Sequence, residues 1–295
     1  MTAPIDTDAC FGPNSGSTVN SAKRFLLNQF REAGLDTPDL DARALLIAAT
    51  GFTHSDLITR GTEGLPPNAL ELISDYASRR LGGEPVDHIL GYREFYGRRF
   101  KVSKDVLSPR PETEMLVDAA LELLKGKPSP NIIDLGTGSG AIIISILAET
   151  KIVRGVAVDL SKTALEIAKE NAAVHNVADC LTLLQGSWLD PVSGPFDIIL
   201  SNPPYITAAA IEELDKEVKG FDPDLALSGG EDGLTAYRAI IAKAGNYLSP
   251  DGILLFEIGY DQGSSVSDLL FEAGFTDISV HKDLSGHDRM IKAAL

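Results

Sequence analysis

The sequence is poor in cysteine, the residue that forms disulfides and many structural metal sites. It has two cysteines in 295 residues, Cys10 and Cys180, far apart and without metal-type spacing. Neither a disulfide framework nor a metal site is therefore predicted, and a reducing cytoplasm is favoured. No stretch approaches the roughly 18 apolar residues of a membrane span. Residues 1–20 contain no Lys or Arg, so we expect a disordered lead and not a targeting signal.

Basic residues are also scarce. The chain has 26 Lys and Arg against 42 Asp and Glu, which gives a net charge of −16. This balance opposes a phosphate backbone as the main partner, so no direct contact with nucleic acid is predicted. Hydrophobic residues make up 44% of the chain, enough for a sizeable core. The length favours a main domain and a smaller one.

The smaller domain is predicted to be helical. Over residues 21–83 apolar side chains recur at helical spacing, with breaks at Gly34, Gly51 and Pro66-Pro67, which is typical of a small helical bundle. Residues 84–111 differ, because alternation around Gly97 predicts a β-hairpin linker to the main domain.

The main domain is predicted to cover residues 112–295. Its predicted strands alternate with helices, which indicates a doubly wound, mostly parallel, seven-stranded sheet. The last two strands are joined by the short link 285–288, so we expect them to be antiparallel. The predicted strands are 132–135, 153–158, 181–184, 196–200, 253–258, 275–280 and 289–293, and the predicted helices are 115–124, 141–149, 163–175, 234–248 and 266–273.

The segment Ser201-Asn202-Pro203-Pro204-Tyr205 follows the predicted strand 196–200. In open α/β sheets ligands bind at the carboxyl ends of strands. The prolines remove two backbone donors, so the Asn202 side chain and the Pro203 carbonyl can both accept hydrogen bonds from one ligand, beside the flat ring of Tyr205. Such a site suits a planar group that bears NH2, either an amide or the amine of a base. Taken alone, Asn-Pro-Pro is also typical of an ordinary turn.

A cofactor site is predicted one strand away. Gly136-Thr-Gly-Ser-Gly140-Ala141 is a turn that lets a ligand approach backbone and a helix amino terminus. Asp159, about 20 residues on, can accept hydrogen bonds from ribose hydroxyls. The loop fits both a dinucleotide and an adenosyl cofactor. The hydrogen-bond acceptors at 202–205 favour an adenosyl cofactor with a transferable methyl group, since hydride transfer by a nicotinamide dinucleotide does not require such acceptors.

The segment 108–114 starts a helix at Pro111 and is expected also to line the cofactor site. Trp188 is either a wall of the adenine pocket or a core aromatic. Asn202, Pro203 and Tyr205 are the candidate catalytic residues, and with Pro204 they are also the candidate substrate-binding residues. The candidate cofactor-binding residues are Arg110, Glu112, Thr113, Gly136, Thr137, Gly138, Ser139, Gly140, Asp159, Leu160, Ser187, Trp188 and Asn202.

These motifs together resemble the HemK/PrmC family from about Ala22 to Leu295. At Ser108, His88 and Asp222 the sequence departs from the residues usual in that family. The matching motifs are Pro109-Arg-Pro-Glu-Thr-Glu114, Asp134-Leu-Gly-Thr-Gly-Ser-Gly140, Ser201-Asn-Pro-Pro-Tyr-Ile206 and Glu257-Ile-Gly259.

The resemblance implies a class I, Rossmann-like methyltransferase that uses S-adenosylmethionine and releases S-adenosylhomocysteine. The implied substrate is the glutamine amide of the Gly-Gly-Gln motif in class 1 peptide chain release factors. We expect the bundle to dock this protein and the enzyme to be a monomer. The alternatives are a nucleic-acid adenine amino-methyltransferase, a glutamine methyltransferase of another translation protein such as a ribosomal protein, and a non-catalytic adenosyl-binding module.

Overall fold

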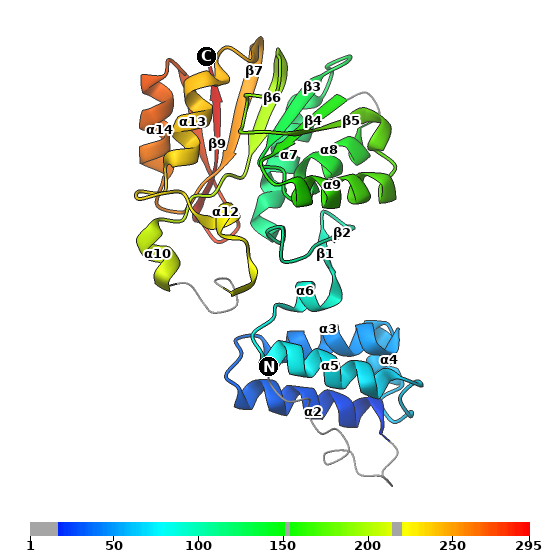
Figure 1. Ribbon diagram of the computed structural model, residues 1–295. Coiled ribbons are helices and arrows are strands. Elements are labelled where there is room, and N and C mark those ends of the chain that lie inside the picture. The colour runs from blue at the N-terminus through cyan, green and yellow to red at the C-terminus, as the bar shows by residue number, and fades with distance from the viewer. Residues whose placement is uncertain (1–16, 151–153, 214–219) are drawn as a thin grey trace. The chain divides into compact units, whose positions relative to one another are not determined.

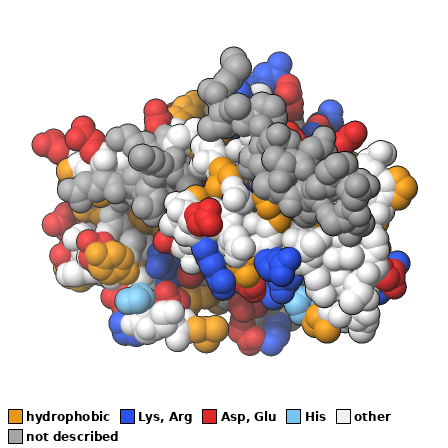
Figure 2. All heavy atoms as spheres, turned by 90° about the horizontal axis from the view of Figure 1, so that it is seen from below, with side chains coloured by type: hydrophobic (Ala, Val, Ile, Leu, Met, Phe, Trp, Pro, Cys, Tyr) orange, Lys and Arg blue, Asp and Glu red, His pale blue; other side chains and the backbone are white. Residues whose placement is uncertain are grey.

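The computed structural model describes residues 17–150, 154–213 and 220–295. The chain divides into two compact units, Met1–Gly91 and Tyr92–Leu295 (Figure 1). None of the helices in the described ranges is long and apolar enough to cross a membrane. On the face drawn in Figure 2, described acidic and basic side chains lie interspersed with apolar ones.

The first unit is the predicted helical bundle. Leu26, Phe30 and Ile73 are fully buried in its core. Arg80 Nε lies 2.7 Å from Asp41 Oδ2 in an ion pair that is itself buried, so a charged contact ties two of the helices together. The helices are α2 (Val19–Glu32), α3 (Pro38–Thr50), α4 (His54–Thr59), α5 (Ala69–Leu81) and α6 (Val86–Leu90).

Both ends of the bundle differ from the prediction. Helix α2 begins at Val19, inside the segment assigned to a disordered lead, because Thr18 caps it and Val19 packs into the core. Residues 1–16 of that lead lie outside the described residues. At the other end, the predicted linker contains α6, which buries Ile89 in the bundle. The unit therefore ends at Gly91 and not at Gly83.

The second unit holds a two-stranded hairpin and a seven-stranded sheet of order β5-β4-β3-β6-β7-β9-β8. Its hairpin is β1 (Tyr92–Phe95) and β2 (Arg98–Lys101), and its sheet is β3 (Asn131–Leu135), β4 (Arg154–Asp159), β5 (Leu181–Gln185), β6 (Phe196–Ser201), β7 (Leu248–Glu257), β8 (Asp277–Lys282) and β9 (Asp288–Ala294). Its helices are η1 (Pro111–Thr113), α7 (Glu114–Leu124), α8 (Ala141–Glu149), α9 (Lys162–Val174), η2 (Ala178–Cys180), α10 (Ala208–Glu213), α12 (Asp224–Leu227), α13 (Thr235–Ala244) and α14 (Gly263–Glu272).

Strands β3 to β7 run parallel, whereas β9 is antiparallel to both of its neighbours, which confirms the predicted end of the sheet. Successive strand residues face opposite sides. Ile132 packs in one core with α7 and α8, and Ile133 packs in the other with α13 and α14 (Figure 1). Helices thus cover both faces of a mostly parallel sheet, as the alternation of elements predicted.

Three details of this unit were not predicted. Helix α13 ends at Ala244, and Leu248 is already the first residue of β7. The pairing with β6 shifts after Phe196, so a bulge separates Leu248 from the stretch beginning at Ile253, and this bulge hid the strand's start in the sequence. Helices α10 and α12 are short and have too little periodicity to be recognised.

Candidate active site

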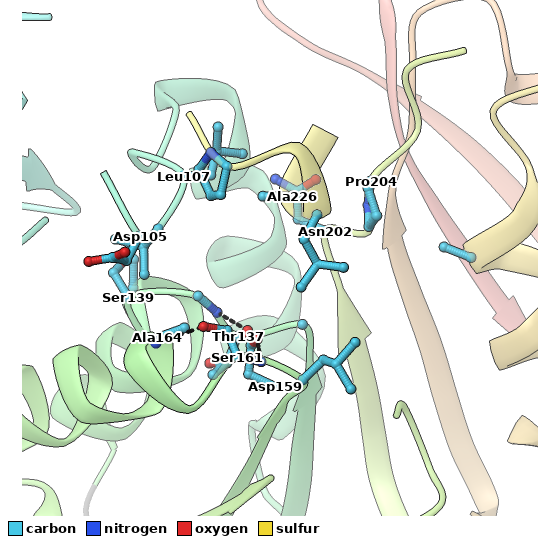
Figure 3. A pocket seen from close by; sticks show the side chains of 18 of the residues that line it. Asp105, Leu107, Thr137, Ser139, Asp159, Ser161, Ala164, Asn202, Pro204 and Ala226 are labelled. Atoms are coloured by element: carbon cyan, nitrogen blue, oxygen red, sulfur yellow. Dashed lines mark hydrogen bonds between the residues drawn. The ribbon is translucent and has the colours of Figure 1, made fainter. Parts of the chain in front are cut away.

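A cavity of about 450 Å³ opens at the carboxyl edge of the parallel strands (Figure 3). Parallel strands end on one side of a sheet, so the loops after β3, β4, β5 and β6 meet there. The predicted residues on its wall are Arg110, Thr113, Gly136, Thr137, Gly138, Ser139, Asp159, Leu160, Ser187, Trp188, Asn202 and Pro204. Glu112, Gly140, Pro203 and Tyr205 are not among its lining residues.

The glycine loop between β3 and α8 requires its glycines for two reasons. Gly140 has φ +81°, and a Cβ there would lie 2.6 Å from Ile144 Cδ1. Gly136 has φ +73°, and its Cβ would lie 3.3 Å from Trp188 Cζ3. Gly140 therefore serves close packing of the helix below the cavity, whereas Gly136 lets the loop approach the ring of Trp188 on the wall.

Asp159, at the end of β4, holds the loop in place. Its Oδ2 accepts a hydrogen bond from the Gly138 amide at 2.8 Å, and its Oδ1 accepts one from the Ser161 amide at 2.8 Å. Burial raises the pKa of this carboxyl, and the two backbone hydrogen bonds lower it. A carboxylate has about four acceptor positions, so Asp159 keeps capacity to accept from hydroxyls in the cavity that it lines.

Two further side-chain contacts hold the loop. Asn171 of α9 donates to the Ser139 carbonyl at 2.8 Å and accepts from the Lys101 amide at 2.8 Å, so one amide joins loop and hairpin. Thr137 donates to Asp134 Oδ2 at 2.7 Å. Burial raises the pKa of Asp134 to about 7, although the Thr137 bond lowers it.

Part of the cavity wall was not predicted. It includes residues 105–107, Pro223, Leu225 and Ala226, which belong to no recognisable motif and, apart from Asp105, are apolar. Ser108 and Pro109, from the segment expected to line the site, also lie on the wall. Ser108 Oγ is buried on this wall and has no hydrogen-bond partner in the described structure. A volume in the range of small-molecule sites, mostly apolar walls, a carboxylate and an unpaired hydroxyl fit a nucleoside-containing cofactor.

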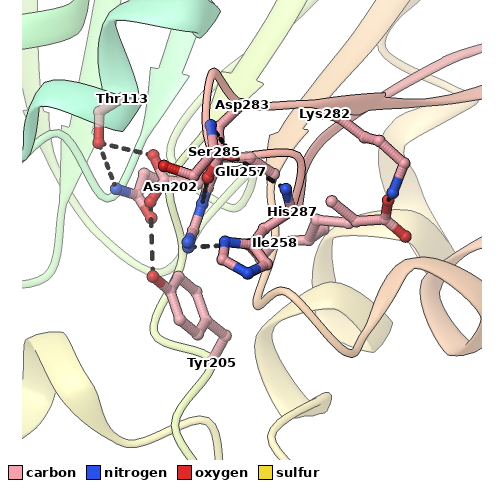
Figure 4. Close-up of polar contacts among 11 residues, drawn as sticks. Thr113, Asn202, Tyr205, Glu257, Ile258, Lys282, Asp283, Ser285 and His287 are labelled. Carbon is pink, nitrogen blue, oxygen red and sulfur yellow. Dashed lines mark hydrogen bonds and ion pairs between the residues drawn. The ribbon is translucent and has the colours of Figure 1, made fainter.

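Asn202 stands where β6 ends, and Ser201 fixes that end by donating to the Leu135 carbonyl of β3 at 2.6 Å. The Asn202 Nδ2 donates to Thr113 Oγ1 at 3.2 Å (Figure 4). Asn202 Oδ1 accepts no hydrogen bond from the described residues and belongs to a side chain on the cavity wall. Among the described residues this acceptor on a cavity-lining side chain is therefore left without a donor.

Glu257 lies behind Asn202 and is only 2% exposed. Its Oε2 accepts from the Thr113 hydroxyl at 2.6 Å, and the Tyr205 hydroxyl lies 3.5 Å from its Oε1 (Figure 4). The pKa of Glu257 is raised to about 7, chiefly by burial, whereas the Thr113 hydrogen bond and the charge of Arg289 lower it. Tyr205 thus points its hydroxyl at this carboxyl, and burial raises the pKa of that hydroxyl to about 12.

Further polar contacts hold the backbone of Tyr205 and the side chain of Asp222. Gln262 Nε2 donates to the Tyr205 carbonyl at 3.1 Å, and Arg110 lies 3.4 Å from Asp222. Glu257 and Gln262 carried no sequence signal beyond the Glu257-Ile-Gly259 motif, because their partners lie far away in the chain. Among the described residues, no group of three or more His, Cys, Asp or Glu could hold a metal ion.

Known proteins resemble both units. The family model of the PrmC N-terminal domain matches residues 22–91, and that of the methyltransferase small domain matches residues 112–217. The release factor glutamine methyltransferase of Cereibacter sphaeroides is 44% identical over 274 residues, 93% of this chain and 97% of the relative. That of Bradyrhizobium diazoefficiens is 43% identical over 285 residues, 95% of this chain and 96% of the relative.

A solved structure supports the fold alone. The hMettl16 catalytic domain, crystallised with an RNA hairpin, is 14% identical and superposes with a TM-score of 0.55 over 68% of this chain and 76% of that chain.

Asn171→Ala tests how the loop is held. Removing the amide leaves the Ser139 carbonyl and the Lys101 amide without their partner, so we expect the free energy of unfolding to fall by about 1–3 kcal/mol. Calorimetric titration should also show weaker binding of S-adenosylmethionine. The exposed Asn246→Ala is the control and should change neither quantity. Unchanged affinity in Asn171→Ala would show that the loop keeps its shape without this anchor.

Proposed function

The chain belongs to the family of release factor glutamine methyltransferases, and from this membership we propose that it methylates the glutamine side chain of the Gly-Gly-Gln motif in class 1 peptide chain release factors. The chain is a methyltransferase whose cofactor is S-adenosylmethionine and whose second product is S-adenosylhomocysteine. The observation that carries the proposal is the free Oδ1 of Asn202 beside the cavity, on an amide fixed by Thr113.

The acceptor needs help because a glutamine amide nitrogen is a poor nucleophile, its lone pair being delocalised into the carbonyl. S-adenosylmethionine supplies a methyl group bonded to a positively charged sulfur. We propose that Asn202 Oδ1 and the Pro203 carbonyl accept the two N–H groups, which aims the nitrogen lone pair at the methyl group. Because positive charge builds on that nitrogen, the same acceptors stabilise the transition state.

In this mechanism a nitrogen–carbon bond forms as the sulfur–carbon bond breaks. The nitrogen then loses one proton readily, so we assign no general base. Tyr205 directs its hydroxyl to Glu257, and its role is to hold the segment that carries the two acceptors. Tyr205 is thus proposed as support for the site.

We propose that the cofactor lies in the cavity, with its ribose hydroxyls on Asp159. Gly136, Gly138 and the neighbouring loop backbone would border the rest of the nucleoside, and Leu160 and Trp188 would flank the base. Ser108, with its unpaired Oγ, is the residue of this wall that a polar cofactor atom would satisfy. Residues of one chain supply both the cavity wall and Asn202, which supports a monomer. The net charge of −16 supports a protein without direct contact to nucleic acid, and we propose that it acts in the cytoplasm.

The acceptor is tested by methyl transfer from labelled S-adenosylmethionine. We expect label on an intact release factor and none on a copy whose Gly-Gly-Gln glutamine is replaced by alanine. Duplex DNA and ribosomal proteins serve as further acceptors in the same assay. Label on DNA would indicate an adenine amine as the acceptor, and label on a ribosomal protein a different glutamine, in either case against the proposal.

Asn202→Ala should separate chemistry from cofactor binding. We expect kcat to fall on the order of 10²- to 10³-fold, as on removal of one preorganised polar group, because one N–H of the acceptor loses its partner. The Kd for S-adenosylmethionine should stay close to that of the parent, and Asn246→Ala should be unaffected in both. A loss confined to cofactor affinity would contradict the assigned role.

We further propose that the unit Met1–Gly91 docks the protein substrate. The cavity and the contacts of Asn202 lie wholly within the unit Tyr92–Leu295, so the first unit is free to serve recognition. Removing residues 1–91 should raise KM for an intact release factor and leave methylation of a short Gly-Gly-Gln peptide unchanged. Equal KM values for the intact factor, with and without the bundle, would refute docking.

A further inference from the structure

Asn202, Thr113 and Glu257 form a chain of hydrogen bonds that leads from the cavity into the core (Figure 4). We propose that Glu257 is a positioning residue: its carboxylate, acting through the Thr113 hydroxyl, determines which end of the Asn202 amide faces the acceptor nitrogen. The inference rests on the proposed function, in which that end must be the oxygen.

The donor and acceptor roles in these hydrogen bonds follow from the single proton of the Thr113 hydroxyl. Thr113 Oγ1 lies 2.6 Å from Glu257 Oε2, and an ionised carboxylate can only accept, so Thr113 donates its proton there. Only lone pairs of Thr113 then remain for Asn202. The group of Asn202 that lies 3.2 Å away must therefore be the NH2, and Oδ1 is left for the cavity.

Protonation of Glu257 removes this constraint. A neutral carboxyl group can donate to Thr113 Oγ1, and the Thr113 proton then becomes available for Asn202 Oδ1. An amide turned in that way would present NH2 to a substrate that also presents N–H groups. Two donors repel, so the acceptor nitrogen would lose the partner that orients it.

The surroundings of Glu257 make both protonation states accessible. Its backbone carbonyl accepts from the Tyr237 hydroxyl at 2.9 Å, which fixes the strand end. The pKa of the carboxyl is raised to about 7, chiefly by burial; the nearby charge of Glu112 also raises it, whereas the Thr113 hydrogen bond and Arg289 lower it. The titratable and charged groups that face it are Glu112 on η1, Tyr205 after β6, Tyr237 on α13 and Arg289 on β9.

Glu257→Gln is the first test. Glutamine can donate to Thr113 as the protonated acid does, so we expect kcat to fall on the order of 10²-fold, the effect of a misplaced reacting group. Glu257 does not line the cavity, so the Kd for S-adenosylmethionine should be unchanged. Thr113→Ser keeps a hydroxyl and should lose less kcat than Thr113→Val, which removes it. The control is Glu170→Gln, which alters an exposed carboxylate paired with Lys101.

The pH profile gives a readout that a purely structural role would not change. The active form is the carboxylate, so kcat of the parent should fall as pH drops through the pKa of Glu257, about 7, and should level off above it. Glu257→Gln should lack this step. A variant that keeps the parental kcat and the parental step would overturn the inference.

A double-mutant cycle tests whether Glu257 works through Asn202. In an Asn202→Ala background the amide is absent, so Glu257→Gln should cause little further loss of kcat. Losses that multiply would mean that Glu257 supports the site by some other route and would overturn the inference.

A substrate-free measurement keeps this inference separate from the proposed function. With ¹⁵N-labelled asparagine, the side-chain NH2 resonances of Asn202, assigned by their loss in Asn202→Ala, should shift across the titration of Glu257. They should not shift in Glu257→Gln. Asn202 resonances that do not shift with pH in the parent would overturn the inference, whichever molecule accepts the methyl group. Resonances that titrate, in a protein that methylates no release factor, would support the coupling and refute only the proposed function.

Discussion

The parallel pairing of β3 with β6 is the constraint on which the rest of the site depends. It aligns Leu135 with Ser201, so the glycine loop and Asn202 must leave the sheet side by side. The Ser201 hydroxyl, bonded to the Leu135 carbonyl at 2.6 Å, locks the two strand ends at that register. Because the chain turns to opposite faces of the sheet on either side of this pair, a crevice opens there, and the cavity occupies it.

The parts of this arrangement that could be predicted are those with local signals. A loop that needs positive φ at several nearby positions is recognised by its glycines, and the end of a strand is recognised by Asn-Pro-Pro. The contact of Thr113 with Glu257 spans 144 residues and has no such signal. Leu225 and Ala226 line the cavity as ordinary apolar residues, and only the tertiary fold brings them there.

Packing also determines the element boundaries that differ from the prediction. Leu248 begins β7 through a pairing with Phe196 that is followed by a bulge, and a bulge interrupts the alternation by which strands are recognised. Val86–Leu90 forms a helix because Ile89 finds a place in the bundle core, a tertiary reason that five residues cannot reveal on their own. The layers of the fold and the loops of the site could thus be predicted from sequence patterns, whereas the first residues of several elements depend on tertiary packing.

The free oxygen of Asn202 has a consequence for how such a protein can change over evolutionary time. In the proposed mechanism, an acceptor pair contacts only the last few atoms of a target, a planar carbon that carries NH2, and makes no contact with the rest of the target molecule. Selectivity between targets must then reside in surfaces outside the strand end. A lineage could therefore acquire a new target by remodelling those surfaces, while the chemistry at the end of β6 is inherited unaltered.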